Sequence, residues 1–585
     1  MSLGSSIQQL RLREHQLFLA LTIVVGVLAG LSAVLFTVAI DWTTRLFFGL
    51  DPSTARLFVV PVAVSLVTGV LLAWVFPDVR GSGVPQTEAA YHLHSGVIPG
   101  RVPLGKFVTG VLCIGSGHSM GREGPSVQIG AGLASVVGRW VPLSAARVKD
   151  LVPVGAAGAL AAAFNTPVAA VLFALEEIIG DMNATLLGST VVASVASVVV
   201  ERSILGNEPL FRVPAYHLQH PIELLAYAAL GILGGVVSLV FCKALLSLRR
   251  LFMTLPRWTR VWQPAIGGLL IGAILVFRPE VMGVGYEYVD QALNGGLVFK
   301  TMVLLCVLKL VATTVSYSSG NAGGIFAPSL YIGAMAGGAV GTIVHRLAPL
   351  QTADAGAYAL VGMGTLFAGI IRAPMTSVFM IFEITQDYQI LVPLMVANLL
   401  SFLISRRFQP VPVYHALLQQ DHIHLPSAAT RVAPASWTAA DVMGSDVNLV
   451  SPDVTVQQVW EASGRNGTPA FLVGTPERLV GVVSAQQLAA AMESGRPSEP
   501  IATLLGAEMV HAHLDHPSET VLERLAQSAG VLPIVSRDDA QRVLGVVTFP
   551  QIMLFMRTRR AASGTTSFAD ATTSVSRTSQ IQPGP

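Results

Sequence analysis

The sequence predicts an all-α polytopic membrane protein with inverted internal repeats and broken helices, followed by a small cytoplasmic α/β region. Only 12% of its 585 residues are charged and 52% are apolar, whereas about 25% of the residues of a soluble protein are charged. Apolar runs of about 20 residues, the length that crosses a bilayer, recur over the first 410 residues. Ten-residue segments near residues 121 and 324 also repeat, as in duplicated transporters.

The apolar runs define the expected membrane helices. Most later runs are shorter and interrupted by glycine or proline, so we expect many helices to cross incompletely or at a tilt. The first run follows Arg11 and Arg13 without an Ala-x-Ala site, which predicts a retained helix and not a signal peptide. The clearest runs are "LFLALTIVVGVLAGLSAVLFTVAI" (17–40), "LFVVPVAVSLVTGVLLAWVF" (57–76) and "LLAYAALGILGGVVSLVFCKALL" (224–246).

Basic residues at both ends of the membrane part predict its orientation. Arg11 and Arg13 precede the first apolar run, and Arg406 and Arg407 close the last one. By the positive-inside tendency, the N-terminus and the C-terminal region are both expected on the cytoplasmic side. The compact loops and short tails favour a bacterial inner membrane, and the net charge of +2 gives no indication of nucleic-acid binding.

No catalytic or metal-binding pattern stands out. The three cysteines lie singly in apolar runs, which argues against a disulfide framework or a metal cluster. Ser116 and His118 could belong to a membrane serine hydrolase, but residues two apart do not face each other on a helix. Because no GxSxG or HExxH motif accompanies them, we expect these two residues to pack between helices, and the chain not to be an enzyme. The cysteines are Cys113, Cys242 and Cys306.

The membrane part contains an internal repeat. The segment "GREGPSVQIG" (121–130) matches "GIFAPSLYIG" (324–333) at five of ten positions, and residues 154–177 match residues 361–384. The offsets of 203 and 207 are nearly equal, so we expect two repeat halves, about 15–205 and 220–410. In transporters built from such repeats, the substrate site lies between the halves.

Three segments rich in glycine and proline predict an anion site. Glycines followed by proline at a helix start leave backbone N–H groups free and let another group approach closely. Those N–H groups lie at the positive end of the helix dipole and bind anions without a full positive charge, which permits rapid passage. The residues expected to build these helix starts are Gly81, Gly83, Pro85, Gly121, Gly124, Pro125, Gly324 and Pro328.

Glu123 places a carboxylate inside this anion site. An ionisable residue within a membrane segment is a candidate functional residue by default. When ionised, its carboxylate can occupy the anion position, and when protonated it can leave. Proton and anion occupancy would then be coupled. The alternative is a structural ion pair with Arg122, but sequence neighbours normally point apart on a helix.

Together these segments resemble the motifs of a known family. "GSGVP", "GREGP" and "GGIFAP", in this order and followed by a late tyrosine, are similar to the motifs of the CLC chloride channels and chloride/proton antiporters over about residues 15–420. The resemblance implies a homodimer in which each subunit has its own chloride path. It further implies chloride coordination by the hydroxyls of Ser82 and Tyr414 and the backbone amides of Ile325 and Phe326, with Glu123 as the gate.

The resemblance also bears on proton coupling. Antiporters of the family carry a second, inner glutamate for proton transfer, and "VLFALEEIIG" aligns Glu177 with it, next to Glu176. The combination of Glu123 and Glu177 favours chloride/proton antiport. The alternative is a passive chloride channel gated by Glu123. The fluoride-selective branch is disfavoured, because its motifs depart from "GREGP" and it lacks the tyrosine.

The composition becomes soluble after residue 410. "RLVGVVSAQQL" (478–488) and "RVLGVVTFPQI" (542–552) repeat at an offset of 64, and the pair resembles two CBS domains, modules that commonly bind adenine nucleotides. Gln487 and Gln551 stand where nucleotide-binding copies carry an aspartate for the ribose. This argues against nucleotide binding and for a structural or dimer-stabilising role, with ligand sensing as the alternative. The expected divisions are 1–420 for transport, 421–436 as linker, 437–492 and 500–560 as copies, and 561–585 as a disordered tail.

Overall fold

The computed structural model divides the chain into two compact units, residues 1–426 and 427–585, and each is described by itself. The described residues are 3–49, 51–181, 184–207, 210–211, 213, 219–425, 437–444, 447, 449–466, 470–475, 478–506, 509–516, 518–528 and 530–562. Most of the expected linker (426–436) and nearly all of the expected tail (563–585) lie outside them.

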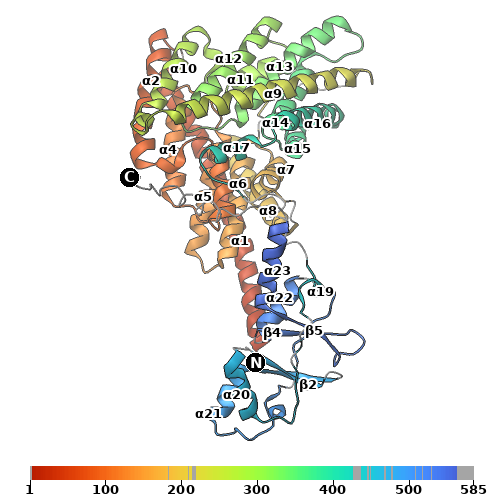
Figure 1. The fold of residues 1–585 in the computed structure, drawn as a ribbon. Helices are drawn as coiled ribbons and strands as arrows, with labels where there is room; N and C mark the ends of the chain where they lie inside the picture. The colour runs from red at the N-terminus through yellow and green to blue at the C-terminus, as the bar shows by residue number, and fades with distance from the viewer. Residues whose placement is uncertain are drawn as a thin grey trace, which may run out of the picture. The chain divides into compact units, whose positions relative to one another are not determined.

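The first unit is built from helices, as the composition predicts (Figure 1). Its first half contains α1 (Leu3–Phe48), α2 (Thr54–Val70), α3 (Val84–Leu93), α4 (Arg101–Gly115), α5 (Glu123–Trp140), α6 (Ala145–Phe164), α7 (Pro167–Phe173) and α8 (Ala184–Leu205). Its second half contains α9 (Glu223–Thr254), α10 (Gln263–Phe277), α11 (Tyr286–Leu293), α12 (Phe299–Ser318), α13 (Phe326–Leu347), α14 (Ala355–Ile370), α15 (Pro374–Thr385), α16 (Leu391–Phe408) and α17 (Val413–Gln420).

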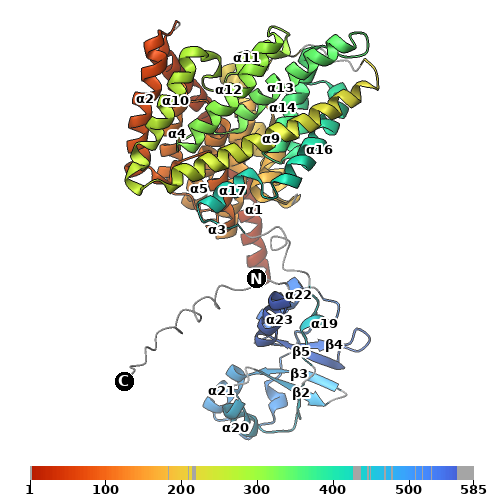
Figure 2. The ribbon, with the colours of Figure 1, turned by 45° about the horizontal axis from the view of Figure 1, so that its top comes forward.

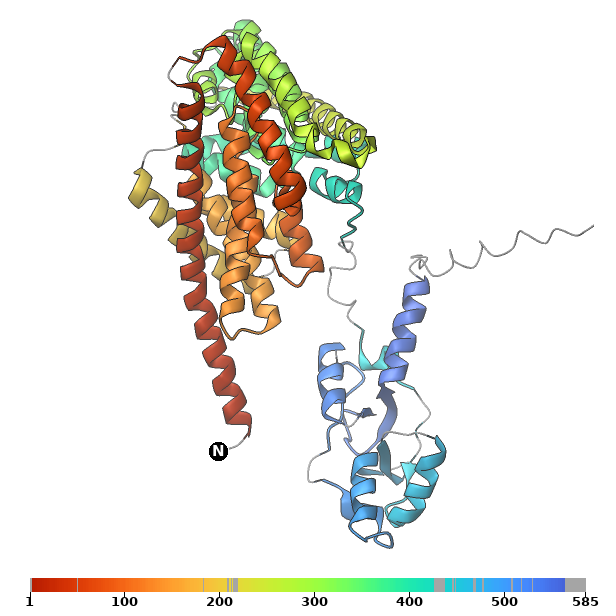
Figure 3. The ribbon, with the colours of Figure 1, turned by 90° about the vertical axis from the view of Figure 1, so that its left-hand side faces the viewer.

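Long apolar helices alternate with short ones. Among the described residues, seven helices are long and apolar enough to cross a membrane, while α10, α14 and α15 are apolar but shorter. The three clearest apolar runs of the sequence fall in α1, in α2 with the following π-helical turn η1 (Leu71–Val75), and in α9. Figure 3 shows α1 as one continuous helix whose N-terminal end extends past the other helices of this unit.

The repeat is visible in the helix packing. Helix α5 packs on α6, and their repeat counterparts α13 and α14 pack in the same way. In both pairs a glycine of one helix meets a glycine of the other: a Cβ on Gly130 or Gly155 would overlap the partner's carbonyl, and Gly333 and Gly362 show the same close approach. Small residues at these crossings let membrane helices approach to backbone distance.

Two glutamates join the halves by capping each other's helices. Glu383, near the end of α15, accepts hydrogen bonds from the N–H groups of Val168 (2.9 Å) and Ala169 (2.7 Å) at the start of α7. Glu176 accepts from the N–H group (2.9 Å) and hydroxyl (2.8 Å) of Thr376 at the start of α15. A carboxylate stabilises a helix N-terminus by satisfying free donors and by facing the positive end of the dipole.

The second unit is α/β. A three-stranded sheet has the order β1-β2-β3, with β1 parallel to β2 and β2 antiparallel to β3, and β4 and β5 form an antiparallel pair. Each hairpin runs directly into a helix, as the 64-residue repeat predicts. The elements are α19 (Ala439–Val442), β1 (Leu449–Val450), α20 (Val456–Asn466), β2 (Ala470–Thr475), β3 (Arg478–Ser484), α21 (Ala485–Glu493), α22 (Ser518–Gln527), β4 (Val531–Val535), β5 (Val543–Thr548) and α23 (Phe549–Ala562).

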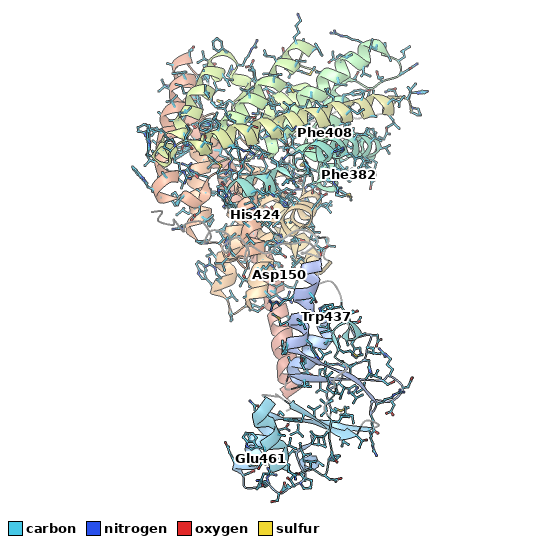
Figure 4. The ribbon with its side chains drawn as sticks, viewed as in Figure 1. Asp150, Phe382, Phe408, His424, Trp437 and Glu461 are labelled. Atoms are coloured by element: carbon cyan, nitrogen blue, oxygen red, sulfur yellow. The ribbon has the colours of Figure 1, made fainter. Side chains whose placement is uncertain are left out.

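The two copies of this unit share a core. Leu472 of β2, Leu479 of β3 and Val535 of β4 are buried in one apolar cluster. Trp437, labelled in Figure 4, is the first residue of the first copy but is buried against Phe555 of α23 in the second. The exchange of this segment and the common cluster explain why the two copies pack as one module.

Candidate anion and proton site

The three predicted helix starts come together in the structure. Helices α3, α5 and α13 begin after Gly83, Arg122 and Ile325. Gly121 and Gly324, the matching first residues of the two repeat segments, donate an N–H to each other's carbonyl, both at 2.8 Å. This pairing is antiparallel, as a two-fold relation between inverted repeats requires. The backbone itself therefore fixes the two helix starts beside each other.

The third helix start is tied to the same place. The N–H of Gly323 donates to the carbonyl of Gly81 at 3.1 Å, which links the loop before α3 to the loop before α13. Lys106 of α4 is fully buried and its ammonium donates to the carbonyls of Val79 (2.9 Å) and Gly81 (2.6 Å). A buried lysine that binds only carbonyl groups holds this loop in a single conformation.

The close approach of the loops explains why a glycine occupies position 124 of the motif. A Cβ on Gly124 would overlap the Ser82 hydroxyl and lie 3.3 Å from the Cα of Gly324. No residue other than glycine fits at this point without moving one of the two loops. Gly124 therefore lets α3, α5 and α13 meet.

Two buried hydroxyls face this convergence of amides. Ser82 and Tyr414 are both fully buried, and the Tyr414 hydroxyl of α17 lies near that of Ser82. Neither hydroxyl makes a hydrogen bond of standard geometry with another described residue. Buried polar groups in native structures normally have partners, so these two neighbouring hydroxyls form a candidate anion site.

The backbone of Ile325 and Phe326 starts α13 in a fixed setting. Ile325 is the N-cap residue of α13, and both side chains are buried. The Phe326 ring packs against Phe164, Phe173 and Phe367, with centroid distances of 4.9, 5.7 and 4.4 Å. The aromatic cluster anchors the side chain and leaves the amide end of the helix to face the site.

Glu123 lies at this end of α13. Its side chain is fully buried, and the carboxylate interacts with its own backbone N–H and with that of Ala327. The carboxylate thus lies where an anion would meet these donors. Among the described residues no ion pair joins Glu123 to Arg122; the Arg122 guanidinium lies over the ring of Tyr286, 5.6 Å from its centroid.

The adjacent glutamates of the inner motif have separate surroundings. Both lie on a π-helical turn, η3 (Ala174–Ile179), and such turns are frequent at functional sites. Glu176 caps α15, as described above. Glu177 is buried and lies within electrostatic range of Tyr414 and Arg372. The structure therefore gives Glu176 a structural role, while Glu177 is buried within electrostatic range of Tyr414.

One half-buried pair was not expected from the sequence. The Nε2 of His415, the neighbour of Tyr414, lies 2.6 Å from Oε1 of Glu88 on α3. Glu88 is fully buried, and the pair joins α3, which follows Ser82, to α17, which carries Tyr414. The two residues are 327 positions apart, and no sequence motif indicated that they meet.

Ser116 and His118 pack between helices, as predicted. The Ser116 hydroxyl donates to the carbonyl of Cys113 at 3.0 Å. The His118 ring lies between the hydroxyls of Ser65 (2.5 Å) and Ser316 (3.3 Å). Both of its ring nitrogens are thus engaged away from Ser116.

The glutamines in the soluble unit are engaged at the starts of their own helices. Oε1 of Gln487 accepts from the N–H (2.8 Å) and hydroxyl (3.0 Å) of Ser484, and Gln551 does the same with Thr548 at the same distances. The cavity next to Gln487 has a volume of about 150 Å³, whereas pockets for drug-sized ligands measure about 300–1,000 Å³. The absence of a bound nucleotide from this module stays a prediction.

Comparison with known proteins agrees with the geometry. The family model described as voltage gated chloride channel matches residues 63–406. The H(+)/Cl(-) exchange transporter ClcA of Vibrio campbellii is 32% identical over 417 residues, covering 68% of this chain and 88% of that protein. A solved slow cyanobacterial Cl⁻/H⁺ antiporter is 28% identical, with a TM-score of 0.64, over 69% of this chain and 97% of its own.

A eukaryotic CLC transporter shares the fold with a TM-score of 0.60 at 20% identity, over 92% of this chain and 98% of its own. That coverage extends beyond the membrane unit into the soluble one. With the family match over more than half of the chain and the identity to ClcA, the protein belongs to the CLC family of voltage-gated chloride channels and transporters.

Proposed function

We propose that the protein exchanges chloride for protons across a membrane. The observation that carries the proposal is the position of Glu123: its fully buried carboxylate lies at the start of α13, close to the backbone N–H of Ala327. A carboxylate and a chloride ion compete for such donors. Protonation removes the charge that holds Glu123 there. The binding of a proton and the departure of the carboxyl group from the anion position are therefore the same event.

The chloride path is proposed to pass the two unsatisfied hydroxyls. Ser82 and Tyr414 offer neutral O–H donors, and the amides of Ile325 and Phe326 add partial positive charge from the start of α13. Lys106 binds carbonyl groups and does not add a free donor to this set. A site made of neutral donors binds an anion weakly enough to release it.

The proton path is proposed to run between Glu177 and Glu123. Glu177 lies near Tyr414 on one side of the anion site, and Glu123 lies at α13. The alternative function is a passive chloride channel gated by Glu123 alone. Glu177 favours exchange, because a buried acidic residue near the path is costly to keep without a proton to carry.

Reconstituted liposomes test the proposal. An imposed chloride gradient should drive proton movement against the proton gradient, and Glu123→Gln should retain chloride flux while losing that proton movement. A chloride flux without any proton movement in the wild-type protein would favour the channel. Glu176→Gln serves as the matched control, because it removes a carboxylate from the adjacent position without touching the proposed path.

The assembly and the arrangement in the membrane complete the proposal. We infer a homodimer with one anion path per subunit, in a bacterial inner membrane with both termini cytoplasmic. We further assign residues 1–420 to transport, and 437–492 and 500–560 to a CBS pair with a structural role. Cross-linking in native membranes and protease accessibility of the soluble unit from each side would test these assignments.

A further inference from the structure

Helix α11 is built like α3, the helix that starts at the anion site. The loop before α3 carries Gly81 and Gly83 and the loop before α11 carries Gly283 and Gly285, and all four have positive φ, of 78°, 104°, 53° and 79°. Figure 2 shows α3 and α11 near opposite ends of the membrane unit. Both the glycine spacing and the placement are those of repeat-related elements.

The loop before α11 also has its own buried lysine. Lys309 of α12 is fully buried and donates to the carbonyls of Val281 (3.1 Å) and Gly283 (2.7 Å). Lys106 makes the same two contacts to the loop before α3. The loop before α11 is therefore held by the same kind of contacts as the loop that carries Ser82.

That first residue is Tyr286, and its side chain is directed at Glu123. The Tyr286 hydroxyl donates to Oε1 of Glu123 at 2.5 Å. Phe211 packs edge-on against the ring at 5.2 Å, and the Arg122 guanidinium lies over it at 5.6 Å. The ring is held on two sides, so its hydroxyl has a defined direction.

We propose that Tyr286 is a positioning residue for Glu123, which holds the ionised carboxylate on the start of α13 and so sets the pH at which the anion path opens. The inference rests on the proposed function, because it takes Glu123 as the gate. It adds a residue from the second repeat that acts on the gate from the side of α11, as Ser82 acts on the anion from the side of α3.

The effect follows from the asymmetry of the hydrogen bond. A phenol donates a stronger hydrogen bond to a carboxylate than to a neutral carboxylic acid. Tyr286 therefore favours the ionised, seated form of Glu123 over the protonated form that can leave. The titratable groups that face Glu123 are Arg122, Tyr286, Lys309 and Tyr414, and only Tyr286 makes a direct side-chain hydrogen bond to it among the described residues.

The test measures chloride flux from liposomes as a function of pH. Tyr286→Phe keeps the ring between Phe211 and Arg122 and removes only the hydroxyl. We expect its half-maximal pH to lie about one unit above that of the wild type, a tenfold change in the protonation equilibrium. Tyr288→Phe, in the same helix and without a hydrogen bond to Glu123, should show the wild-type profile and controls for folding.

A double variant tests whether the effect passes through the carboxylate. With Glu123→Gln in place, adding Tyr286→Phe should leave chloride flux unchanged within about twofold at every pH. A change of the same size in the Glu123→Gln background would overturn the inference. So would an unshifted pH profile for the single variant Tyr286→Phe when the wild-type protein transports chloride. A wild-type protein that moves no chloride would instead overturn the proposed function, and this inference with it.

Discussion

Lys106 and Lys309 occupy matching positions in the two repeats, 203 residues apart, and each buried ammonium donates to two carbonyls of the loop before a short helix. The first of these loops carries Ser82 and the second leads to Tyr286. One structural device, used twice, therefore fixes the loop with the Ser82 hydroxyl of the proposed anion site and the loop that leads to the Tyr286 hydroxyl bonded to Glu123.

Replacement of the two lysines should separate these roles. Lys106→Met and Lys309→Met keep the length of the side chain but leave two carbonyls without a donor, at a cost of about 1–3 kcal/mol for each unsatisfied group. We expect Lys106→Met to weaken chloride binding by calorimetry, and Lys309→Met to shift the pH profile of chloride flux. Thermal unfolding would check that both variants remain folded, and the opposite pattern of effects would contradict the assignment.

The two adjacent glutamates should give opposite results. Glu177→Gln is expected to abolish proton movement while chloride flux continues, because only its titration is lost. Glu176→Gln weakens the cap on α15 and should lower the free energy of unfolding by about 1 kcal/mol, with coupling intact. Proton uptake in liposomes and thermal unfolding measure the two effects, and loss of coupling in Glu176→Gln would refute the division of roles.

The contact between Glu88 and His415 should support the anion site from behind. His415→Ala removes the 2.6 Å contact that joins α3 to α17 and leaves a buried carboxylate without its imidazole. We expect chloride affinity to fall about 3–10-fold, because α3, which follows Ser82, and α17, which carries Tyr414, lose the contact that joins them. Calorimetric chloride titration measures it. His424→Ala, an exposed histidine outside α17, provides the control.

The soluble module should be indifferent to adenine nucleotides. Because the amide oxygens of Gln487 and Gln551 are occupied by their own helix starts, we expect no heat of binding when the full-length protein in detergent is titrated with ATP up to millimolar concentration. Binding that is lost in Gln551→Ala would show that the glutamine serves a ribose after all.

Acidification should lower the stability of the same module. Burial and nearby Arg524 lower the pKa of His516 below its ordinary 6.5, so the unfolded chain takes up a proton that the folded chain resists. The stability of the module, as far as it depends on His516, is therefore greatest above pH 6.5 and declines as the pH falls below that value. Hydrogen exchange of β4 in the full-length protein, corrected for intrinsic rates, should accelerate between pH 7 and pH 5. His516→Gln should reduce that acceleration.

A second group adds to the decline at lower pH. A hydrogen bond from the Arg537 guanidinium, at 2.6 Å from one carboxylate oxygen, lowers the pKa of Asp515 below 3.8. The stabilisation that it provides is present above that value and is lost as the carboxylate becomes protonated. Both residues are largely exposed, so added salt should weaken the effect of this pair.

Local chemistry made the three converging helix starts predictable. Proline fixes φ and glycine adopts backbone conformations that other residues avoid, so the three helix starts could be identified, and the repeat related two of them. Tyr286 was missed because the segment before it shares only spaced glycines with "GSGVP". Lys309 was missed because a single lysine in an apolar run gives no sign of whether it is exposed or buried. The contact of Glu88 with His415 depends on tertiary packing over 327 residues, which no local pattern encodes.

The reciprocal caps of Glu176 and Glu383 constrain how the chain can be made. The N–H of Val168 donates to Glu383, which is synthesised 215 residues later. The N–H of Thr376 donates to Glu176, which is synthesised 200 residues earlier. The amino-terminal half consequently emerges from the ribosome with α7 incomplete, and a product truncated before α15 cannot reach its native form. Co-expression of the two halves as separate polypeptides should restore what neither fragment attains alone.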